Sequence, residues 1–130
     1  MIDKKAKAYQ EMAPLLADFV RDLNDSSKEG WWVLVEGRRD ESALRAIGYG
    51  GGLLAASSLG RRDKEALSTA KGVVILTDLD REGAALASRF VKQLRHNGVK
   101  VSLDERRRLK GILRGIFLHV ENLSRFGSAE

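Results

Sequence analysis

Cysteine and long apolar runs are absent from this chain, and proline occurs once. Without cysteine, disulfides and thiolate-bound zinc sites are excluded. No apolar stretch approaches the roughly 20 residues of a membrane-spanning helix, and the first residues, MIDKKAKAYQE, lack the apolar centre of a signal peptide. These absences predict a cytoplasmic protein with no membrane partner. The length of 130 residues suits one domain with one sizeable core.

Positive charge is unevenly spread along the chain. The net charge is +5, and residues 89–114 hold nine basic residues against two acidic ones, whereas residues 31–88 balance at eight of each. A basic segment beside an acidic site suits a polyanion that is gripped in one place and processed in another. The alternative is a solvated helix face rich in arginine, and charge alone favours this simpler interpretation.

Periodicity in the apolar residues predicts alternating strands and helices. Strands are expected over residues 31–35, 53–56, 73–77, 99–103 and 116–120. Helices are expected through residues 12–23 (beginning or kinking at Pro14), after a cap at Asp40, over residues 58–70 and 81–97, and after a cap at Asp104. Residues 24–30 are a polar break. This alternation predicts an α/β fold, in which a mostly parallel central sheet is flanked by helices in a compact three-layer arrangement.

Three carboxylates stand where predicted strands end. The sequence WWVLVEG places Glu36 after the first strand, and VVILTDLDREG places Asp78 and Asp80 after the third. Ligands of open α/β sheets bind beyond the carboxyl ends of the strands. If these two strands are neighbours, the three acids converge at one edge of the sheet.

Clustered carboxylates repel one another unless a cation neutralises them or one of them stays protonated. Oxygen ligands favour Mg²⁺ or Mn²⁺ over Zn²⁺, and Mg²⁺ held by one or two carboxylates plus substrate phosphates is typical of phosphoryl chemistry. We therefore predict that Asp78 and Asp80 hold the metal. Glu36 is predicted to move a proton near the scissile phosphate or to serve as a further ligand.

Candidate phosphate contacts surround these acids. The guanidinium groups nearest in sequence belong to Arg38, Arg39 and Arg81, and a further basic cluster comprises Arg106, Arg107 and Arg108. Gly37 and Gly83 would let the backbone approach a substrate closely. For the basic cluster, the alternative to phosphate binding is a solvated helix face, which is the more frequent reason for such a cluster.

Each acidic signal also has a simpler structural interpretation. Asp80 and Asp40 could cap the helices that follow them, and Glu36 could be a turn residue. A D-x-D pair also occurs in haloacid-dehalogenase-type phosphatases, but there it follows the first strand and precedes a Thr or Val, where Glu82 stands here. The two motifs together, in an α/β pattern, are a stronger signal than either alone.

The segments VLVEGRRD and VVILTDLDREG resemble the two signature motifs of the Toprim domain. Bacterial primases, type IA and type II topoisomerases, OLD-family nucleases and a ribosomal-RNA-maturing ribonuclease share this domain. The resemblance implies a Toprim domain over residues 31–123, a helical segment over residues 1–30 packed on it, and a tail over residues 124–130. It also implies that Glu36 is the general acid or base, that Asp78 and Asp80 bind the metal, and that Asp40 is a further acid of the site.

The resulting hypothesis is a Mg²⁺- or Mn²⁺-dependent nuclease or nucleotidyl transferase that acts on nucleic acid. RNA is slightly favoured over DNA, by analogy with the ribonuclease. The alternative is a non-catalytic nucleic-acid-binding or adaptor subunit of a larger RNA- or DNA-processing assembly. Tyr9 and Tyr49 lack the context of a strand-cleaving tyrosine, which argues against topoisomerase activity.

Other features are interpreted as structural. The GYGGG segment, residues 48–52, is expected to form a turn near the active edge, and at least one of Trp31 and Trp32 is expected in the core. His96 is expected on the surface, and His119 is expected in a strand with no evident partner.

Overall fold

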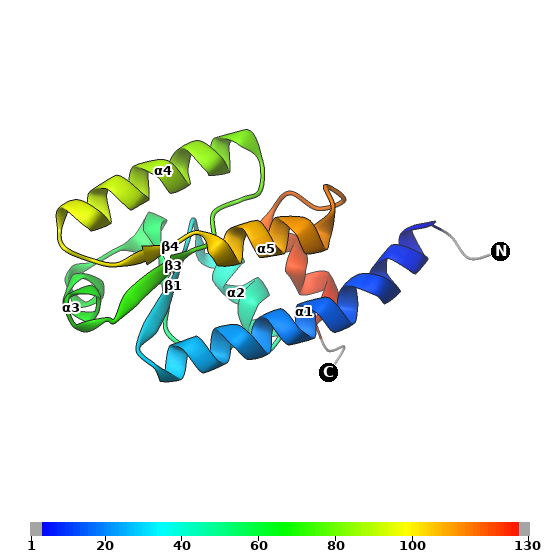
Figure 1. Cartoon of the computed structure of the whole chain (residues 1–130), viewed down its shortest axis with the longest axis horizontal. Coiled ribbons are helices and arrows are strands. Elements are labelled where there is room, and N and C mark those ends of the chain that lie inside the picture. The colour runs from blue at the N-terminus through cyan, green and yellow to red at the C-terminus, as the bar shows by residue number, and fades with distance from the viewer. Residues whose placement is uncertain (1–3, 128–130) are drawn as a thin grey trace.

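Four parallel strands in the order β2-β1-β3-β4 form one sheet in the computed structural model, which describes residues 4–127 (Figure 1). Their bounds are β1 Trp31–Val35, β2 Leu53–Ala55, β3 Gly72–Ile75 and β4 Val101–Ser102. In the register of the sheet, Leu34 of β1 pairs with Leu54 of β2 on one side and with Ile75 of β3 on the other. The predicted parallel sheet is confirmed.

Helices cover both faces of this sheet, because successive strand residues point to opposite sides. Val33, Val35 and Val74 face a core formed with α1 (Lys4–Lys28), α2 (Arg38–Ala46), α5 (Asp104–Leu113) and the 3-10 helix η2 (Val120–Phe126). Leu34, Val73 and Ile75 face a second core formed with α3 (Arg61–Thr69) and α4 (Arg81–His96). The chain is therefore a Rossmann-like three-layer α/β protein, as the sequence predicted.

The helices bury apolar stripes against the sheet. Met12, Leu16, Phe19 and Leu23 of α1 are buried, as are Leu109, Ile112 and Leu113 of α5. Leu15, between these buried residues, is 43% exposed, so the apolar residues of this helix do not all face the core. Within the described residues no helix combines the length and the apolar composition needed to cross a bilayer.

The first helix is longer than its apolar stripe predicted. It runs through Pro14 and ends at Lys28, so it does not begin at the proline, and residues 24–28 of the expected polar break are helical. Asn24 shows why polar residues are tolerated there, since its amide donates to the carbonyl of Gly48 and accepts from the N–H of Gly50.

The predicted strand over residues 116–120 is wrong, because its backbone pairs with a loop and not with the sheet. The carbonyl of Leu118 accepts from the N–H of Leu79, and the N–H of Val120 donates to the side chain of Asp78. The chain then turns into η2, which packs against α2. Of the expected tail over residues 124–130, residues 124–126 belong to η2, and residues 128–130 lie outside the described residues.

Two predicted helix caps lie inside the first turn of their helices. Gly37 is the N-cap of α2, and Asp40 reaches back from the third position to accept the N–H of Gly37 at 3.0 Å. Leu103 is the N-cap of α5, and Asp104 is the first helical residue. Both acids still favour their helix because negative charge is stabilised near an N-terminus.

The GYGGG segment lies at the edge of the sheet opposite to the one expected. It leads into the start of β2, where Gly52 packs against the ring of Trp32 and accepts hydrogen bonds from the N–H of Val33 and the hydroxyl of Tyr49. Because all strands are parallel, the start of β2 lies away from the carboxyl ends that carry Glu36 and Asp78. Tyr49 is buried at 2% exposure, and Trp31 and Trp32 are partly buried against opposite cores.

The order of the strands marks the edge where ligands bind. From β1 the chain crosses to β2 on one side, whereas from β3 it crosses to β4 on the other side. The connections thus diverge between β1 and β3, which is the topological switch point of an open α/β sheet. Glu36 follows β1 and Asp78 follows β3, so both acids lie at this point.

We expect Gly83→Ala to lower the free energy of unfolding by about 1–3 kcal/mol, the usual range for overpacking. An added Cβ at this position would lie only 1.8 Å from the carbonyl oxygen of Asp78, so the start of α4 would have to move. Gly111→Ala in α5 is the matched control: nothing lies within 4 Å of its Cβ position. It should raise stability by about 0.5–1 kcal/mol. Urea denaturation measures both variants, and equal effects would contradict the packing argument.

Candidate metal and carboxylate site

The loop after β3 is fixed to the start of α4. Thr77 is fully buried, and its hydroxyl donates to the carbonyl of Gly83 at 2.7 Å. Asp80 is the N-cap of α4, and its Oδ1 accepts the N–H of Gly83 at 2.7 Å. Asp80 therefore has the capping role that the sequence left open, and its second oxygen remains for another partner.

Glu36 and Asp78 are in direct contact across the switch point. The backbone N–H of Asp78 donates to Oε2 of Glu36 at 2.6 Å. The last regular sheet bond here runs from the N–H of Leu76 to the carbonyl of Leu34. In a regular parallel ladder the N–H two residues further on, that of Asp78, would donate to a backbone carbonyl. Here the carboxylate of Glu36 accepts it instead.

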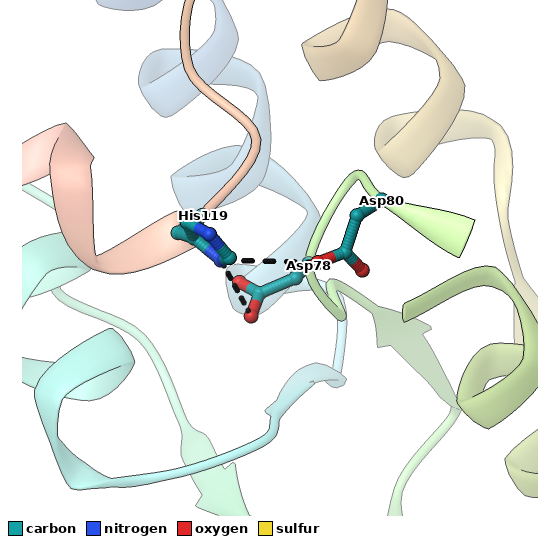
Figure 2. Close-up of side chains that lie close together, drawn as sticks. All are labelled: Asp78, Asp80 and His119. Atoms are coloured by element: carbon teal, nitrogen blue, oxygen red, sulfur yellow. Dashed lines mark hydrogen bonds and ion pairs between the residues drawn. The ribbon is translucent and has the colours of Figure 1, made fainter. Parts of the chain in front are cut away.

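His119 completes the site, although its place in the sequence indicates no partner. Its Nδ1 lies 3.2 Å from Oδ2 of Asp78 and 4.0 Å from Oδ2 of Asp80. Figure 2 shows the imidazole and the two carboxylates facing one another, with His119 on the segment that precedes η2. One ligand atom from each of the three residues lies within 4.8 Å of the others, so this group could hold a metal ion.

The hydrogen bonds of the two aspartates suit a cation. Oδ1 of Asp78 accepts the N–H of Val120 at 2.8 Å, and Oδ1 of Asp80 accepts the N–H of Gly83. In both residues the other oxygen, Oδ2, is the one turned toward His119. Hydrogen bonds that hold one carboxylate oxygen orient the other as a ligand, so the donor set fits a bound metal.

Two predicted metal ligands stand outside this group. Glu36 holds the N–H of Asp78, and Asp40, which is 8% exposed, holds the N–H of Gly37. Both lie near the aspartates, since the charge of Asp78 acts on the pKa of each. In this arrangement they border the Asp78–Asp80–His119 group.

The side chain of Arg106 binds backbone carbonyls of the loop after β3. Its Nη2 donates to the carbonyl of Asp78 at 2.5 Å, and its Nε donates to the carbonyl of Thr77 at 3.3 Å. Partial burial lowers the pKa of this guanidinium, while the charges of Asp80, Glu36 and Asp78 act in the opposite direction. Arg106 therefore places positive charge near the three acids while it holds the loop that carries Asp78 and Asp80.

The other arginines predicted to contact phosphate differ in whether they pair with acidic side chains of the chain. Arg108 pairs with Asp22 of α1 at 2.6 Å and lies over the ring of Phe19, so it links α5 to α1. Arg107 pairs with Asp104 one turn away and is 72% exposed. Arg38 and Arg81 are exposed in the first turns of α2 and α4, and Arg39, also exposed, approaches Glu121 at 3.9 Å.

Burial and mutual repulsion favour the neutral form of the bordering acids. Burial is the main cause that raises the pKa of Glu36, and the charges of Asp78 and Asp40 add to it. Burial likewise raises the pKa of Asp40, with Asp78 and Glu121 adding to the effect. In contrast, the hydrogen bond to Asp78 raises the pKa of His119 and favours the charged imidazolium.

We expect the metal-free protein to lose stability as pH rises through the pKa of folded His119. Its folded pKa lies above the ordinary value of 6.5, so the folded chain retains a proton that the unfolded chain releases. The stabilisation is complete below about pH 6.5 and is lost at higher pH. Urea unfolding with chelator present measures this loss. His119→Gln should remove this part of the pH dependence, whereas His96→Gln, at the exposed end of α4, should keep it.

Comparisons with known proteins identify the family. No family model matches the chain. It is 37% identical over 92 residues to the UPF0292 protein of Pyrococcus abyssi, and the aligned residues cover 70% of each chain. It is 34% identical over 124 residues to that of Thermococcus onnurineus, covering 95% of this chain and 86% of the relative.

Among solved structures, an Aquifex aeolicus protein superposes with a TM-score of 0.67 at 25% identity, covering 82% of this chain and 96% of that one. The names of these proteins state no activity, so they leave the chemistry of the site open. By identity and coverage, the chain belongs to the UPF0292 family.

Proposed function

We propose that this protein is a Mg²⁺- or Mn²⁺-dependent enzyme of the Toprim type that hydrolyses or transfers phosphodiesters of nucleic acid. The observation that carries the proposal is the contact between Glu36 and Asp78 at the switch point, beside the Asp78–Asp80–His119 group. RNA is slightly favoured over DNA by analogy, and a cytoplasmic location remains a prediction.

The roles of the acids follow from their contacts. Asp78 and Asp80 would hold the metal through the oxygens that face His119. When bound, a divalent cation stabilises the negative charge that develops on a reacting phosphate. Glu36 is fixed by the N–H of Asp78, and burial raises its pKa, a direction that suits a general acid or base.

Exposed arginines beside the carboxylates would bind the phosphates of the substrate. Arg38, Arg39 and Arg81 lie at the starts of the two helices that follow the acids, where the helix dipole also favours anions. Arg38 and Arg45 line a surface pocket of about 660 Å³ formed by α2, β2 and α3. In the basic cluster, Arg107 is the most exposed candidate, because Arg106 and Arg108 bind other parts of the chain.

Labelled structured RNA, single-stranded DNA and duplex DNA, each with Mg²⁺, Mn²⁺ or chelator, test the activity. We expect metal-dependent cleavage, and a loss of at least about a hundredfold in both Glu36→Gln and Asp78→Asn, in line with typical general acid–base and metal contributions. Gln93→Ala, on the exposed face of α4, is a control for protein preparation and should cleave like the wild type. Metal-independent binding that is unchanged in both acidic variants, without cleavage, would instead support a binding or adaptor module.

We expect Arg81→Ala to weaken binding to all nucleic acid sequences alike. The loss of one phosphate contact should reduce the slope of log affinity against log salt by about 0.7–0.9. Arg95→Ala removes the same charge from the last turn of α4, at the far end of this helix, and should leave the slope nearly unchanged. Fluorescence anisotropy titrations at several salt concentrations measure both. A loss confined to certain sequences would contradict the assignment of Arg81 to phosphate.

A further inference from the structure

We propose that the imidazole of His119 is a direct ligand of the bound metal, so that the site prefers a first-row transition cation such as Mn²⁺ over Mg²⁺. The inference rests on the proposed metal site and goes beyond it, because the carboxylate motifs alone predict an all-oxygen site. It assigns a function to a histidine that no motif marked.

The first support is the position of the ring. Nδ1 of His119 is the atom that faces the free oxygens of both aspartates, at 3.2 Å from Asp78 and 4.0 Å from Asp80. One ligand atom of each residue thus lies within 4.8 Å of the others, and Figure 2 shows the imidazole facing both carboxylates. The side chain is half exposed, which leaves a path for a cation and for substrate.

The second support is the way the chain fixes this ring. Val120, the next residue, donates its N–H to Oδ1 of Asp78, so adjacent residues contact the two oxygens of one carboxylate. Val120 is fully buried, and the N–H of Leu79 donates to the carbonyl of Leu118 at 2.6 Å. Residues on both sides of His119 are therefore tied to the loop that carries the aspartates.

The third support is the chemistry of the donor set. Mg²⁺ takes oxygen ligands and retains water, whereas first-row transition cations also bind imidazole nitrogen. Two carboxylate oxygens and one imidazole nitrogen are a mixed set of ligands. Mn²⁺ accepts this set, whereas the nitrogen adds little to the affinity for Mg²⁺. Replacing His119 should therefore affect Mn²⁺ more than Mg²⁺.

Pulsed electron paramagnetic resonance of the Mn²⁺-loaded protein tests the ligand directly. Coordinated imidazole nitrogen modulates the Mn²⁺ spin echo, so we expect ¹⁴N modulation in the wild type and its replacement by a ¹⁵N signal in protein labelled with ¹⁵N-histidine. This measurement needs no substitution and does not depend on activity. The modulation should persist in His96→Gln and vanish in His119→Gln, because these are the two histidines of the chain.

Isothermal titration of the same proteins measures the preference. We expect His119→Gln to weaken Mn²⁺ binding on the order of 10–100-fold and Mg²⁺ binding by less than about threefold. His96→Gln should match the wild type for both cations. Circular dichroism melting confirms that each variant is folded before it is titrated.

The outcomes separate this inference from the proposed function. If Mn²⁺ binds, is lost in Asp78→Asn, and shows no histidine nitrogen in the wild type, the ligand role of His119 is wrong while the carboxylate site stands. Equal losses of Mn²⁺ and Mg²⁺ in His119→Gln would likewise overturn the preference. If neither cation binds the wild type, both this inference and the metal-dependent function fail.

Discussion

The hydrogen bond from the N–H of Asp78 to Glu36 is the contact on which the arrangement of the site depends. It continues the parallel β1–β3 ladder for one more step, with a side-chain carboxylate in place of a backbone carbonyl. The carbonyl of Glu36 is free for the other side of the sheet, where it accepts the N–H of Ser57 after β2. Glu36 thereby belongs both to the sheet and to the site, and its position is fixed by the same pairing that holds the fold together.

Backbone N–H groups explain how four acids share one edge of a small protein. Glu36, Asp40, Asp78 and Asp80 each accept one backbone N–H, at distances from 2.6 to 3.0 Å. Hydrogen bonds to the charged form of a carboxylate offset part of its desolvation and of its repulsion by neighbours. Arg106 adds a full positive charge behind the loop. The acids are thus compatible with folding before any cation binds, and a bound cation would relieve the repulsion that remains.

The sequence predicted those parts of the fold and site that depend on local pattern. Alternating apolar runs predicted the parallel sheet, and strand ends predicted where Glu36, Asp78 and Asp80 emerge. His119 could not be found this way, because its contact with Asp78 spans 41 residues and its segment looks like a strand in periodicity alone. The apolar residues of this segment alternate as in a strand, but its backbone hydrogen bonds go to the loop after β3. The contacts of Arg106 with Asp78 and of Arg108 with Asp22 could not be predicted for the same reason, since these partners are distant in sequence.

The three parts of the site do not depend equally on the rest of the molecule. Asp80 is held within its own helix start, through Gly83 and Thr77, by contacts between residues at most six positions apart. Glu36 depends on the pairing of β1 with β3, which lies in the core of the sheet. His119 depends on the segment before η2, which reaches the site from the far end of the chain and is secured by η2 packing on α2. Loosening of this last segment would remove the imidazole and one N–H from Asp78 while leaving Glu36 and Asp80 in place, because their partners lie elsewhere. The composition of the metal site is therefore coupled to the docking of the C-terminal segment, and the carboxylates alone are coupled to the sheet.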